Sequence, residues 1–359
     1  MRAVVVSPGK KGSARLAQRD PPGRQAAHCL VRILQCGIDG TDREINDGLY
    51  GEAPPNEKAL VLGHEALGIV ENAVEPLHEG DLVVPTVRRP CSEQCLNCRE
   101  GEFDFCRSGH FTERGIKGRH GYLSDVISEE PAFLVPVPAH LRAVAVLLEP
   151  LSIVEKAFRE LYAIQERMQW KPQRVLITGS GSIGLLAAFL SSLRGLETTL
   201  YSRGAPSGAE AALIALLELR YVDASDTSLV DAVKQCGAPD IAIEATGYSP
   251  LAWQIADALD INGIACLLSV TAGRRSAEIP SDRLNTELVL GNKVIFGSVN
   301  SHRRDFERGI ADLAAIDARW PGAPARLITR RLPLERIREA LDEDPVGDIK
   351  TIIEIAGGE

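Results

Sequence analysis

The first part of the chain, up to about residue 150, alternates short apolar runs with turn residues such as Gly, Pro and Asp. Short strands separated by turn signals are typical of a β-rich domain. The expected strands cover residues 3–6, 29–34, 67–70, 81–84 and 133–137.

From Arg174 onward the pattern changes to apolar strands separated by helical stretches of about ten to fifteen residues. Six strands in this rhythm predict a parallel, doubly wound sheet with helices on both faces. The expected elements are strands 175–178, 198–201, 220–222, 241–244, 264–269 and 294–297 and helices 183–193, 209–219 and 250–259.

The chain after Ser298 predicts a helix at 305–316, followed by a strand at 326–334. A further helix and a final strand at 350–355 come next. We expect this last strand to rejoin the first domain.

The length of 359 residues favours two domains, since one domain has about 150 residues. We predict an α/β fold in which residues 1–160 and 301–359 form the β-rich domain. Residues 161–300 form a Rossmann nucleotide-binding domain.

Composition and charge exclude several classes of protein. The chain has 45% apolar residues, 40 basic against 49 acidic residues, and no run rich in Lys and Arg, so no nucleic-acid partner is expected. Residues 175–193 are uncharged and long enough to cross a bilayer, but their glycines and serines follow a strand, turn and helix pattern. No membrane association is therefore predicted. The N-terminal apolar run is too short for a signal peptide, which predicts a cytoplasmic location.

A glycine motif directly follows the first strand of the parallel sheet. Gly179, Gly181 and Gly184 form G-x-G-x-x-G, and Ser182 and Ile183 open an apolar helix. In this context the glycines allow a tight turn, close approach of a pyrophosphate and close packing of helix on strand. The motif predicts a dinucleotide whose phosphates lie at the helix N-terminus. The alternative is a glycine-rich turn without a ligand.

The end of the second strand of this domain indicates which dinucleotide binds. NAD sites usually have an acidic residue here that binds the ribose 2′-hydroxyl, whereas this chain has Ser202 and Arg203. A hydroxyl and a guanidinium suit a 2′-phosphate. NADP is the expected cofactor, with NAD possible; the alternative for Arg203 is a solvated turn residue.

Four of the eight cysteines lie close together, at Cys91, Cys95, Cys98 and Cys106. Four thiolates at this spacing can surround one tetrahedral zinc ion and leave no position for a substrate. The sequence therefore predicts a structural zinc site. The alternative is a loop of reduced thiols.

Three further segments, 40–45, 63–65 and 148–151, contain candidate chemistry. Taken singly, each has an ordinary explanation, such as helix caps, a surface turn or a solvated glutamate before a proline. They become specific only because they occur together with the cysteine segment, upstream of a Rossmann unit.

The combined motifs resemble those of the zinc-dependent medium-chain alcohol dehydrogenases, and most closely the archaeal-type glucose (aldose) dehydrogenases. The resemblance covers essentially the whole chain and rests on GTDREI, LGHEALGIV, VVPTVRRPC, the cysteine segment, EPLS and GSVN. It implies a GroES-like catalytic domain interrupted by the Rossmann domain, with the active site in the cleft between them.

The resemblance also implies a catalytic zinc bound by His64, Glu65 and Glu149, the last directly or through water. The residue before GTD is usually a cysteine ligand, and here it is Asp39. Carboxylate oxygen is an accepted zinc ligand, so we expect Asp39 to take this role. A ligand set without a thiolate is chemically harder than one with it. The site should therefore select less strictly for zinc and also accept Mn²⁺ or Co²⁺. An alternative register makes Cys36 the ligand but sacrifices the GTDREI match.

Several polar residues are expected at the substrate. The resemblance implies that Thr41 relays the released proton, and that Asn300 also belongs to the cofactor site. The expected substrate-binding residues are Thr41, Thr86, Glu113, Glu149 and Asn300. For Thr86 and Glu113 the alternative is a loop residue facing water.

The expected activity is the NAD(P)-dependent oxidation of the anomeric carbon of glucose, or a similar aldose, to the lactone. Zinc would lower the pKa of the sugar hydroxyl and the nicotinamide would accept the hydride. The expected catalytic residues are Asp39, Thr41, His64 and Glu65. The alternatives are a polyol or secondary-alcohol dehydrogenase and a non-catalytic nucleotide-binding protein. A homo-oligomer, dimer or tetramer, is expected.

Overall fold

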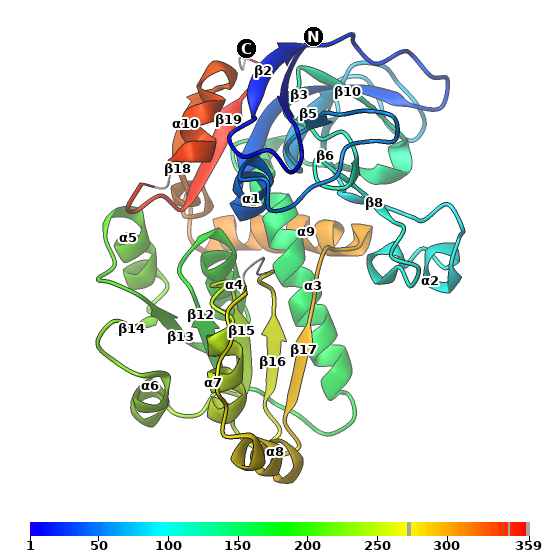
Figure 1. The fold of residues 1–359 in the computed structure, drawn as a ribbon. Helices are drawn as coiled ribbons and strands as arrows, with labels where there is room; N and C mark the ends of the chain where they lie inside the picture. Colours follow the sequence, from blue (N-terminus) through cyan, green and yellow to red (C-terminus); the bar gives the residue numbers. More distant parts are fainter. Residues whose placement is uncertain (271–273, 344, 357–359) are drawn as a thin grey trace. The chain divides into compact units, whose positions relative to one another are not determined.

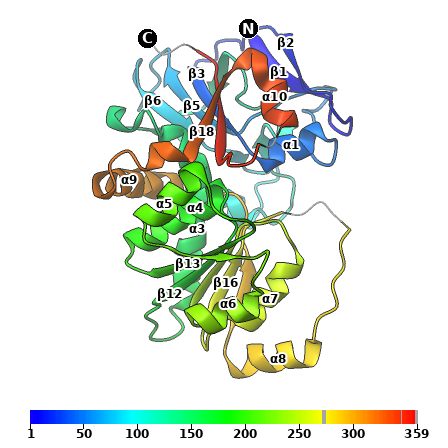
Figure 2. The same cartoon turned by 90° about the vertical axis from the view of Figure 1, so that its left-hand side faces the viewer.

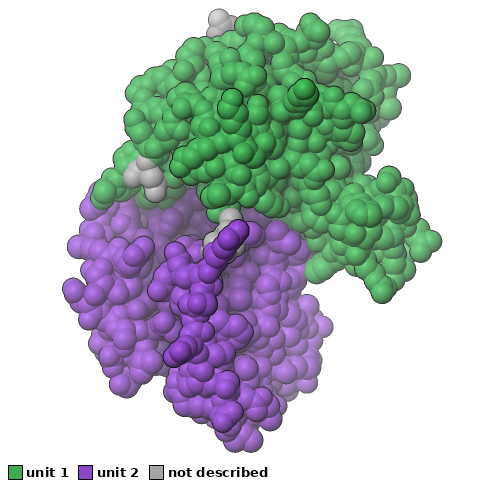
Figure 3. All heavy atoms as spheres, viewed as in Figure 1, with its two compact units in different colours: residues 1–152, 300–314, 328–359 green, residues 153–299, 315–327 purple. Residues whose placement is uncertain are grey.

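The computed structural model describes residues 1–270, 274–343 and 345–356, and the chain divides into two compact units (Figure 3). Unit 1 comprises Met1–Ser152, Asn300–Ala314 and Ile328–Glu359, and unit 2 comprises Ile153–Val299 and Ala315–Leu327. Compared with the expected Rossmann domain, unit 2 begins earlier and includes a second segment of chain.

Unit 1 consists mainly of β-sheet. Its largest sheet has the strand order β11-β6-β5-β3-β19-β18, and β10 also pairs with β3. The strands are β3 (Cys29–Ile38), β5 (Glu65–Val70), β6 (Leu82–Pro85), β10 (Val126–Glu129), β11 (Leu134–Pro136), β18 (Ile328–Pro333) and β19 (Lys350–Glu354). Two smaller sheets contain β1 (Arg2–Val6), β2 (Arg15–Gln18) and β4 (Leu60–Val61), and β7 (Arg88–Arg89), β8 (Thr112–Arg114) and β9 (Gly118–Arg119).

Strand β3 is central to the large sheet because it pairs with β5, β10 and β19. Val31 and Ile33 on this strand are fully buried in the core of the unit. The pairing places Gly37 opposite Glu65 on one side and Ile352 on the other. The last strand of the chain therefore lies beside an early one, blue β3 next to red β19 in Figure 1, as the sequence predicts.

Unit 2 contains a parallel sheet with the strand order β14-β13-β12-β15-β16-β17. The strands are β12 (Arg174–Thr178), β13 (Glu197–Ser202), β14 (Arg220–Asp223), β15 (Ile241–Glu244), β16 (Ile264–Leu267) and β17 (Val294–Gly297). The winding reverses between β12 and β15, and ligands of such sheets bind at the carboxyl ends of the strands at this point. Helices α4 (Ser182–Leu193), α6 (Leu229–Cys236) and α7 (Pro250–Ala258) pack against the sheet (Figure 2). The predicted α/β fold class is confirmed.

The other helices complete the two units. They are α1 (Gly40–Asn46), α2 (Leu96–Arg99), α3 (Leu148–Gln165), α5 (Gly208–Leu216), α8 (Ser281–Leu290), α9 (Arg303–Arg319) and α10 (Ile337–Asp342). Short 3-10 helices cover Phe103–Phe105, Pro131–Phe133, Ala139–Leu141, Ala145–Leu147, Pro324–Leu327 and Leu334–Arg336. Among the described helices, none has the length and apolar character needed to cross a membrane.

Some predicted boundaries are wrong. The strand expected at 264–269 ends at Leu267, and the strand expected at 326–334 begins only at Ile328. A 3-10 helix with Pro324 at its start precedes β18. Arg326 and Leu327 belong to this 3-10 turn, so the strand begins only after it.

Candidate active site

Two residues of unit 1, Asp39 at the start of α1 and His64 just before β5, bring their side chains together. Asp39 is the N-cap of α1: its Oδ1 accepts a hydrogen bond from the Asp42 amide at 3.1 Å. In return, Asp42 Oδ2 accepts a hydrogen bond from the Asp39 amide at 3.3 Å. This reciprocal cap fixes the start of the helix and with it the Asp39 side chain. His64 directly precedes β5 and is buried.

The His64 imidazole lies between two carboxylates. Its Nε2 is 3.5 Å from Asp39 Oδ2, and its Nδ1 is 3.8 Å from Asp42 Oδ1. Nδ1 has no hydrogen-bond partner within the described part of the chain. One ligand atom each from Asp39, His64 and Glu65 lies within 4.8 Å of the others. The Asp39 carboxylate and His64 Nε2, with a Glu65 oxygen close to both, fit a divalent cation.

Cys36, the alternative metal ligand, is not a member of this three-residue group. Its buried thiol donates to the Gly37 carbonyl at 3.6 Å. Burial raises the pKa of Cys36 well above its ordinary value, which disfavours the thiolate that a metal requires. The geometry therefore favours Asp39 over Cys36.

Several titratable groups in this cluster have shifted pKa values. Burial raises the pKa of Asp42 to about 7 and the pKa of Glu149 to about 8. Burial opposes a charged His64, but Asp39 and Asp42 outweigh it and raise the pKa of His64 well above its usual value. In turn, His64 lowers the pKa of Asp39 despite burial. These shifts describe side chains without a metal ion, whose charge would favour the ionised carboxylates.

Glu149 and Thr41 lie in the first turns of two helices. Glu149 is buried at the start of α3, where Pro150 is tolerated because the first turn needs no amide donor. Burial is the main cause of its raised pKa, and the charges of Glu65 and Asp39 add to the rise. Thr41 is half-buried in α1, two positions after Asp39. Their roles toward substrate and metal stay predictions.

Lys350 is a member of this site that the sequence reasoning missed. Its Nζ donates to both Glu65 oxygens at 2.7 Å and to the Ile38 carbonyl at 3.3 Å. Burial disfavours the ammonium, yet Glu65 and Asp39 together raise the pKa of Lys350. The available signal is a lysine at the start of a strand that also contains Ile352 and Ile353, because a lysine buried with such a strand needs a charged partner.

Glu113 and Asn300, two expected substrate-binding residues, are joined by a hydrogen bond. Glu113 Oε1 accepts from Asn300 Nδ2 at 3.2 Å, and from Arg88 Nε and Nη2 at 3.0 and 2.9 Å. All three residues are buried. Arg88 also donates to the Asp104 carbonyl at 2.7 Å and lies 3.8 Å from the Phe111 ring centroid. Sequence reasoning missed Arg88, although a basic pair in VRR before the cysteines is a visible signal.

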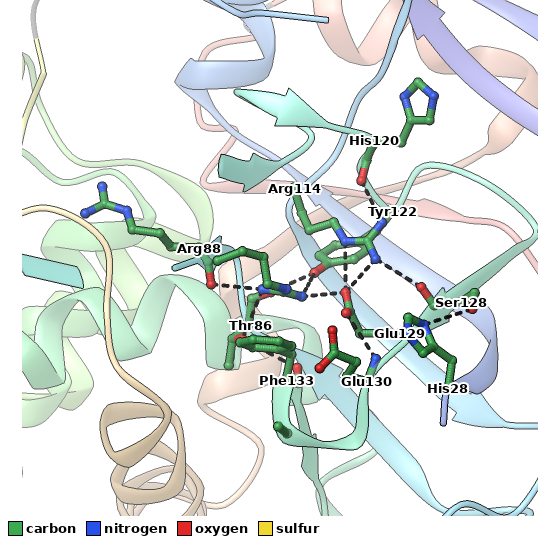
Figure 4. A network of polar contacts seen from close by, with 12 residues as sticks. His28, Thr86, Arg88, Arg114, His120, Tyr122, Ser128, Glu129, Glu130 and Phe133 are labelled. Carbon is green, nitrogen blue, oxygen red and sulfur yellow. Dashed lines mark hydrogen bonds and ion pairs between the residues drawn. The ribbon is translucent and has the colours of Figure 1, made fainter. Parts of the chain in front are cut away.

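Thr86 belongs to a different network, centred on the fully buried carboxylate of Glu129 (Figure 4). The Thr86 carbonyl accepts from Arg89 Nη1 at 2.9 Å and from the Tyr122 hydroxyl at 2.7 Å. The Thr86 hydroxyl donates to the Phe133 carbonyl at 3.5 Å. Its polar atoms are thus already used inside the protein, which favours a structural role over the expected substrate contact.

The four clustered cysteines converge in unit 1. Their sulfur atoms lie within 4.8 Å of one another, and the Cys95 and Cys106 sulfurs are 3.9 Å apart. The amides of Cys98 and Arg107 lower the pKa of Cys95 to about 6, which favours the thiolate. Four converging thiols with a stabilised thiolate fit a closed zinc site.

The glycine motif of unit 2 has the geometry of a phosphate-binding turn. Gly179 has a φ of +95°, which favours glycine. A Cβ on Gly184 would lie 2.0 Å from the Gly179 carbonyl oxygen, so this glycine lets the helix approach the turn. At Gly181, the N-cap of α4, a Cβ would meet nothing within 4 Å, which leaves the amides of Ser182 and Ile183 approachable.

Ser202 and Arg203 lie at the carboxyl end of β13. The Ser180 hydroxyl in the glycine turn donates to the Ser202 hydroxyl at 2.9 Å, which joins the two loops. The turn after β13 is held by Asp223, whose Oδ1 accepts from the Gly204 amide at 2.8 Å. Arg203 is exposed on this turn, next to the glycine motif.

Two family descriptions match this chain. Residues 25–139 match the alcohol dehydrogenase GroES-like domain, and residues 142–355 match the glucose dehydrogenase C-terminus. Together with the fold and the candidate metal site, the first match defines the class of medium-chain alcohol dehydrogenases. The second covers more than half of the sequence, and the chain belongs to the glucose dehydrogenase family.

Individual relatives agree with this assignment. Glucose 1-dehydrogenase of Methanocella arvoryzae is 43% identical over 99% of both chains, and that of Thermoproteus tenax is 39% identical over 99% of both chains. The structure is similar to that of Haloferax mediterranei glucose dehydrogenase in complex with NADP, zinc and gluconolactone, with a TM-score of 0.93 and 33% identity over 100% of both chains. The resemblance inferred from the motifs is confirmed.

Proposed function

We propose that the protein is a zinc-dependent glucose 1-dehydrogenase that oxidises the anomeric carbon of glucose or a similar aldose to the lactone. The carbon–hydrogen bond at C1 gives a hydride to NADP⁺, or less readily to NAD⁺, and the hydroxyl gives up its proton. The observation that carries the proposal is the convergence of ligand atoms of Asp39, His64 and Glu65, in a chain that belongs to the glucose dehydrogenase family.

The metal-binding residues are proposed from the donor atoms. Asp39 and His64 would hold the catalytic zinc, with Glu65 and Glu149 as the further expected partners. When bound, zinc acts as a Lewis acid that lowers the pKa of the sugar hydroxyl. Thr41, next in α1, would accept and pass on the released proton. The four cysteines would hold a second, structural zinc ion.

Glu113 and Asn300 would bind the hydroxyl groups of the sugar. Arg88 and Asn300 both donate to Oε1 of Glu113, so Oε2 can accept a hydrogen bond from a sugar hydroxyl. The Glu113 carboxylate pairs with the Arg88 guanidinium and accepts hydrogen bonds. A plain alcohol would leave this buried acceptor unpaired, which favours a polyhydroxylated substrate.

The cofactor would bind at the glycine motif, with Arg203 on the 2′-phosphate. We expect Arg203→Ala to lower kcat/KM for NADP⁺ about 10- to 100-fold, since a charge-assisted hydrogen bond contributes about 1.5–3 kcal/mol. The kcat/KM for NAD⁺ serves as the control and should be unchanged. Equal losses with both cofactors would show that Arg203 does not bind the 2′-phosphate.

We also propose a cytoplasmic homo-oligomer, a dimer or a tetramer. Strand β17 is the edge of the parallel sheet, and Val289 and Leu290 shortly before it are 65% and 77% exposed. An open edge beside exposed apolar side chains favours association with a second copy. A reducing compartment suits the four clustered thiols. Sedimentation of the purified protein would measure the assembly.

One steady-state experiment tests the activity. Rates are compared for glucose, other aldoses, polyols and secondary alcohols with NADP⁺ and NAD⁺, before and after chelation and zinc addition. We expect an aldose with NADP⁺ to give the highest kcat/KM, and chelation to abolish turnover reversibly. A polyol or secondary alcohol as the best substrate would replace the proposed reaction. No turnover with any of them would favour the non-catalytic alternative.

A further inference from the structure

Glu65 and Lys350 meet across an intervening strand of the large sheet. The strands lie in the order β5-β3-β19, with Glu65 on β5 and Lys350 on β19. Between them, on β3, Gly37 pairs with Glu65. A Cβ on Gly37 would lie 1.9 Å from Glu65 Oε2, so the missing side chain provides the space in which this carboxylate lies.

The resulting ion pair is buried and uses both oxygens of the carboxylate. Lys350 Nζ donates to Oε1 and Oε2 of Glu65 at 2.7 Å each, and to the Ile38 carbonyl at 3.3 Å. The side chains are only 3% and 2% exposed. A pair without access to water is little screened, so its geometry is strongly maintained.

The same carboxylate is therefore within reach of two cations. Its oxygen lies within 4.8 Å of ligand atoms of Asp39 and His64, yet both of its oxygens already accept hydrogen bonds from Lys350. A metal on Glu65 would bring a second cation onto the carboxylate that already pairs with the buried ammonium, and the repulsion between the two cations disfavours this coordination.

On the basis of the proposed function, we infer that Lys350 is a positioning residue that holds Glu65 away from the catalytic metal. Asp39 and His64, with Glu149, would then hold the metal, and Glu65 would not compete with the sugar hydroxyl for it. This modifies the expected ligand set, because Glu65 contributes its charge without coordinating. Gly37 contributes to the same positioning, since the absence of a side chain at this residue provides the space for Glu65.

Lys350→Met tests the inference by releasing Glu65. We expect zinc to bind about tenfold or more tightly in chelator competition, and the absorption spectrum of the cobalt-substituted protein to change because the ligand set changes. Turnover of the zinc-loaded enzyme should fall because Glu65 would compete with the sugar hydroxyl for the metal. Lys350→Arg is the matched control and should keep the parental spectrum and affinity. An unchanged cobalt spectrum in Lys350→Met would overturn the inference.

The double variant Lys350→Met/Glu65→Gln removes both charges of the ion pair. It therefore distinguishes a coordinating Glu65 from one that acts only through its charge. Because it buries no unpaired ion, it is expected to fold even if Lys350→Met does not. If Glu65 does not coordinate the metal, the double variant keeps the parental zinc affinity and cobalt spectrum. A tenfold or greater loss of zinc affinity would show that Glu65 is a ligand in the parent and would overturn the inference.

Gly37→Ala provides an independent route to the same state. The added methyl group should displace Glu65 from Lys350 and shift the cobalt spectrum in the same direction as Lys350→Met. A parental spectrum would contradict the role given to Gly37. Zinc affinity and the cobalt spectrum are both measured without sugar. If the parent did not oxidise aldoses, the proposed function would be refuted, but these two measurements would still test the role of Lys350.

Discussion

Unit 1 contains two clusters of charged side chains that differ in which charge is in excess: two guanidiniums surround one carboxylate in the first, and several carboxylates surround His64 in the second. In the network of Figure 4, Glu129 Oε2 accepts from Arg89 at 2.5 Å and from Arg114 at 2.8 Å, and Oε1 accepts from the Glu130 amide at 3.1 Å. In the other cluster, His64 lies between Asp39 and Asp42 with Nδ1 unsatisfied among the described residues.

The difference indicates what each cluster is for. A buried carboxylate that two guanidiniums and an amide hydrogen-bond holds the fold in one arrangement. A cluster with more carboxylates than cations is destabilised in the free protein by repulsion that a bound cation can remove. The first cluster should control stability and the second should control metal binding and turnover.

His64→Ala should have the largest effect. Removing the imidazole deletes a metal ligand, so kcat/KM should fall at least about 10³-fold, equivalent to about 4 kcal/mol. Zinc content should fall from two ions to one per chain, while the fold is retained. The measurement is metal analysis together with steady-state kinetics. Full activity with one zinc per chain would mean that the cluster is not the catalytic site.

Glu129→Gln should reverse this pattern. The variant leaves Arg89 and Arg114 buried without a carboxylate, which should lower the free energy of unfolding by about 3–5 kcal/mol. The kcat/KM of the folded fraction should change less than threefold. Urea unfolding measures the first quantity and kinetics at low temperature the second. A large fall in kcat/KM at unchanged stability would show that the Glu129 network, like the His64 cluster, controls turnover.

Acid should weaken the network within a defined pH range. Burial alone would raise the pKa of Glu129, but Arg89 and Arg114 outweigh it and lower this pKa to about 2, from an ordinary value of 4.5. A depressed folded-state pKa stabilises the protein above pH 4.5, and this contribution is lost as the pH falls from 4.5 to about 2. The difference in unfolding free energy between parent and Glu129→Gln should narrow across this range. A constant difference would show that Glu129 does not titrate as stated.

Thr86→Val should give the smallest effect. It tests whether Thr86 belongs to the Glu129 network or contacts the substrate. The hydroxyl makes long hydrogen bonds, at 3.5 Å to the Phe133 carbonyl and 3.4 Å from Arg89 Nη1. Losing them should cost about 0.5–1.5 kcal/mol of stability and leave the KM for sugar within twofold. If KM instead rises tenfold at unchanged stability, Thr86 contacts the substrate as the sequence suggests.

The sequence by itself determined the parts of the protein that depend on local pattern. Alternating strands and helices after Arg174 predict the parallel sheet, because periodicity reports which face of each element is buried. The glycine motif and the four cysteines are likewise short-range signals, and their spacing indicates a phosphate turn and a metal site. Asp39 and His64 could be proposed because each lies in a short motif of a recognisable family.

Only the tertiary structure decided which distant residues share a site. Glu65 and Lys350 are 285 positions apart, and Asn300 and Glu113 are 187 positions apart. No local periodicity encodes such a pairing, because it follows from strand order and register in the folded sheet. The same holds for Thr86, whose hydroxyl is used by a buried network rather than left to a ligand. The sequence thus identified the chemical groups, and the sheet determined which of them are already paired and which remain available to a metal or a sugar.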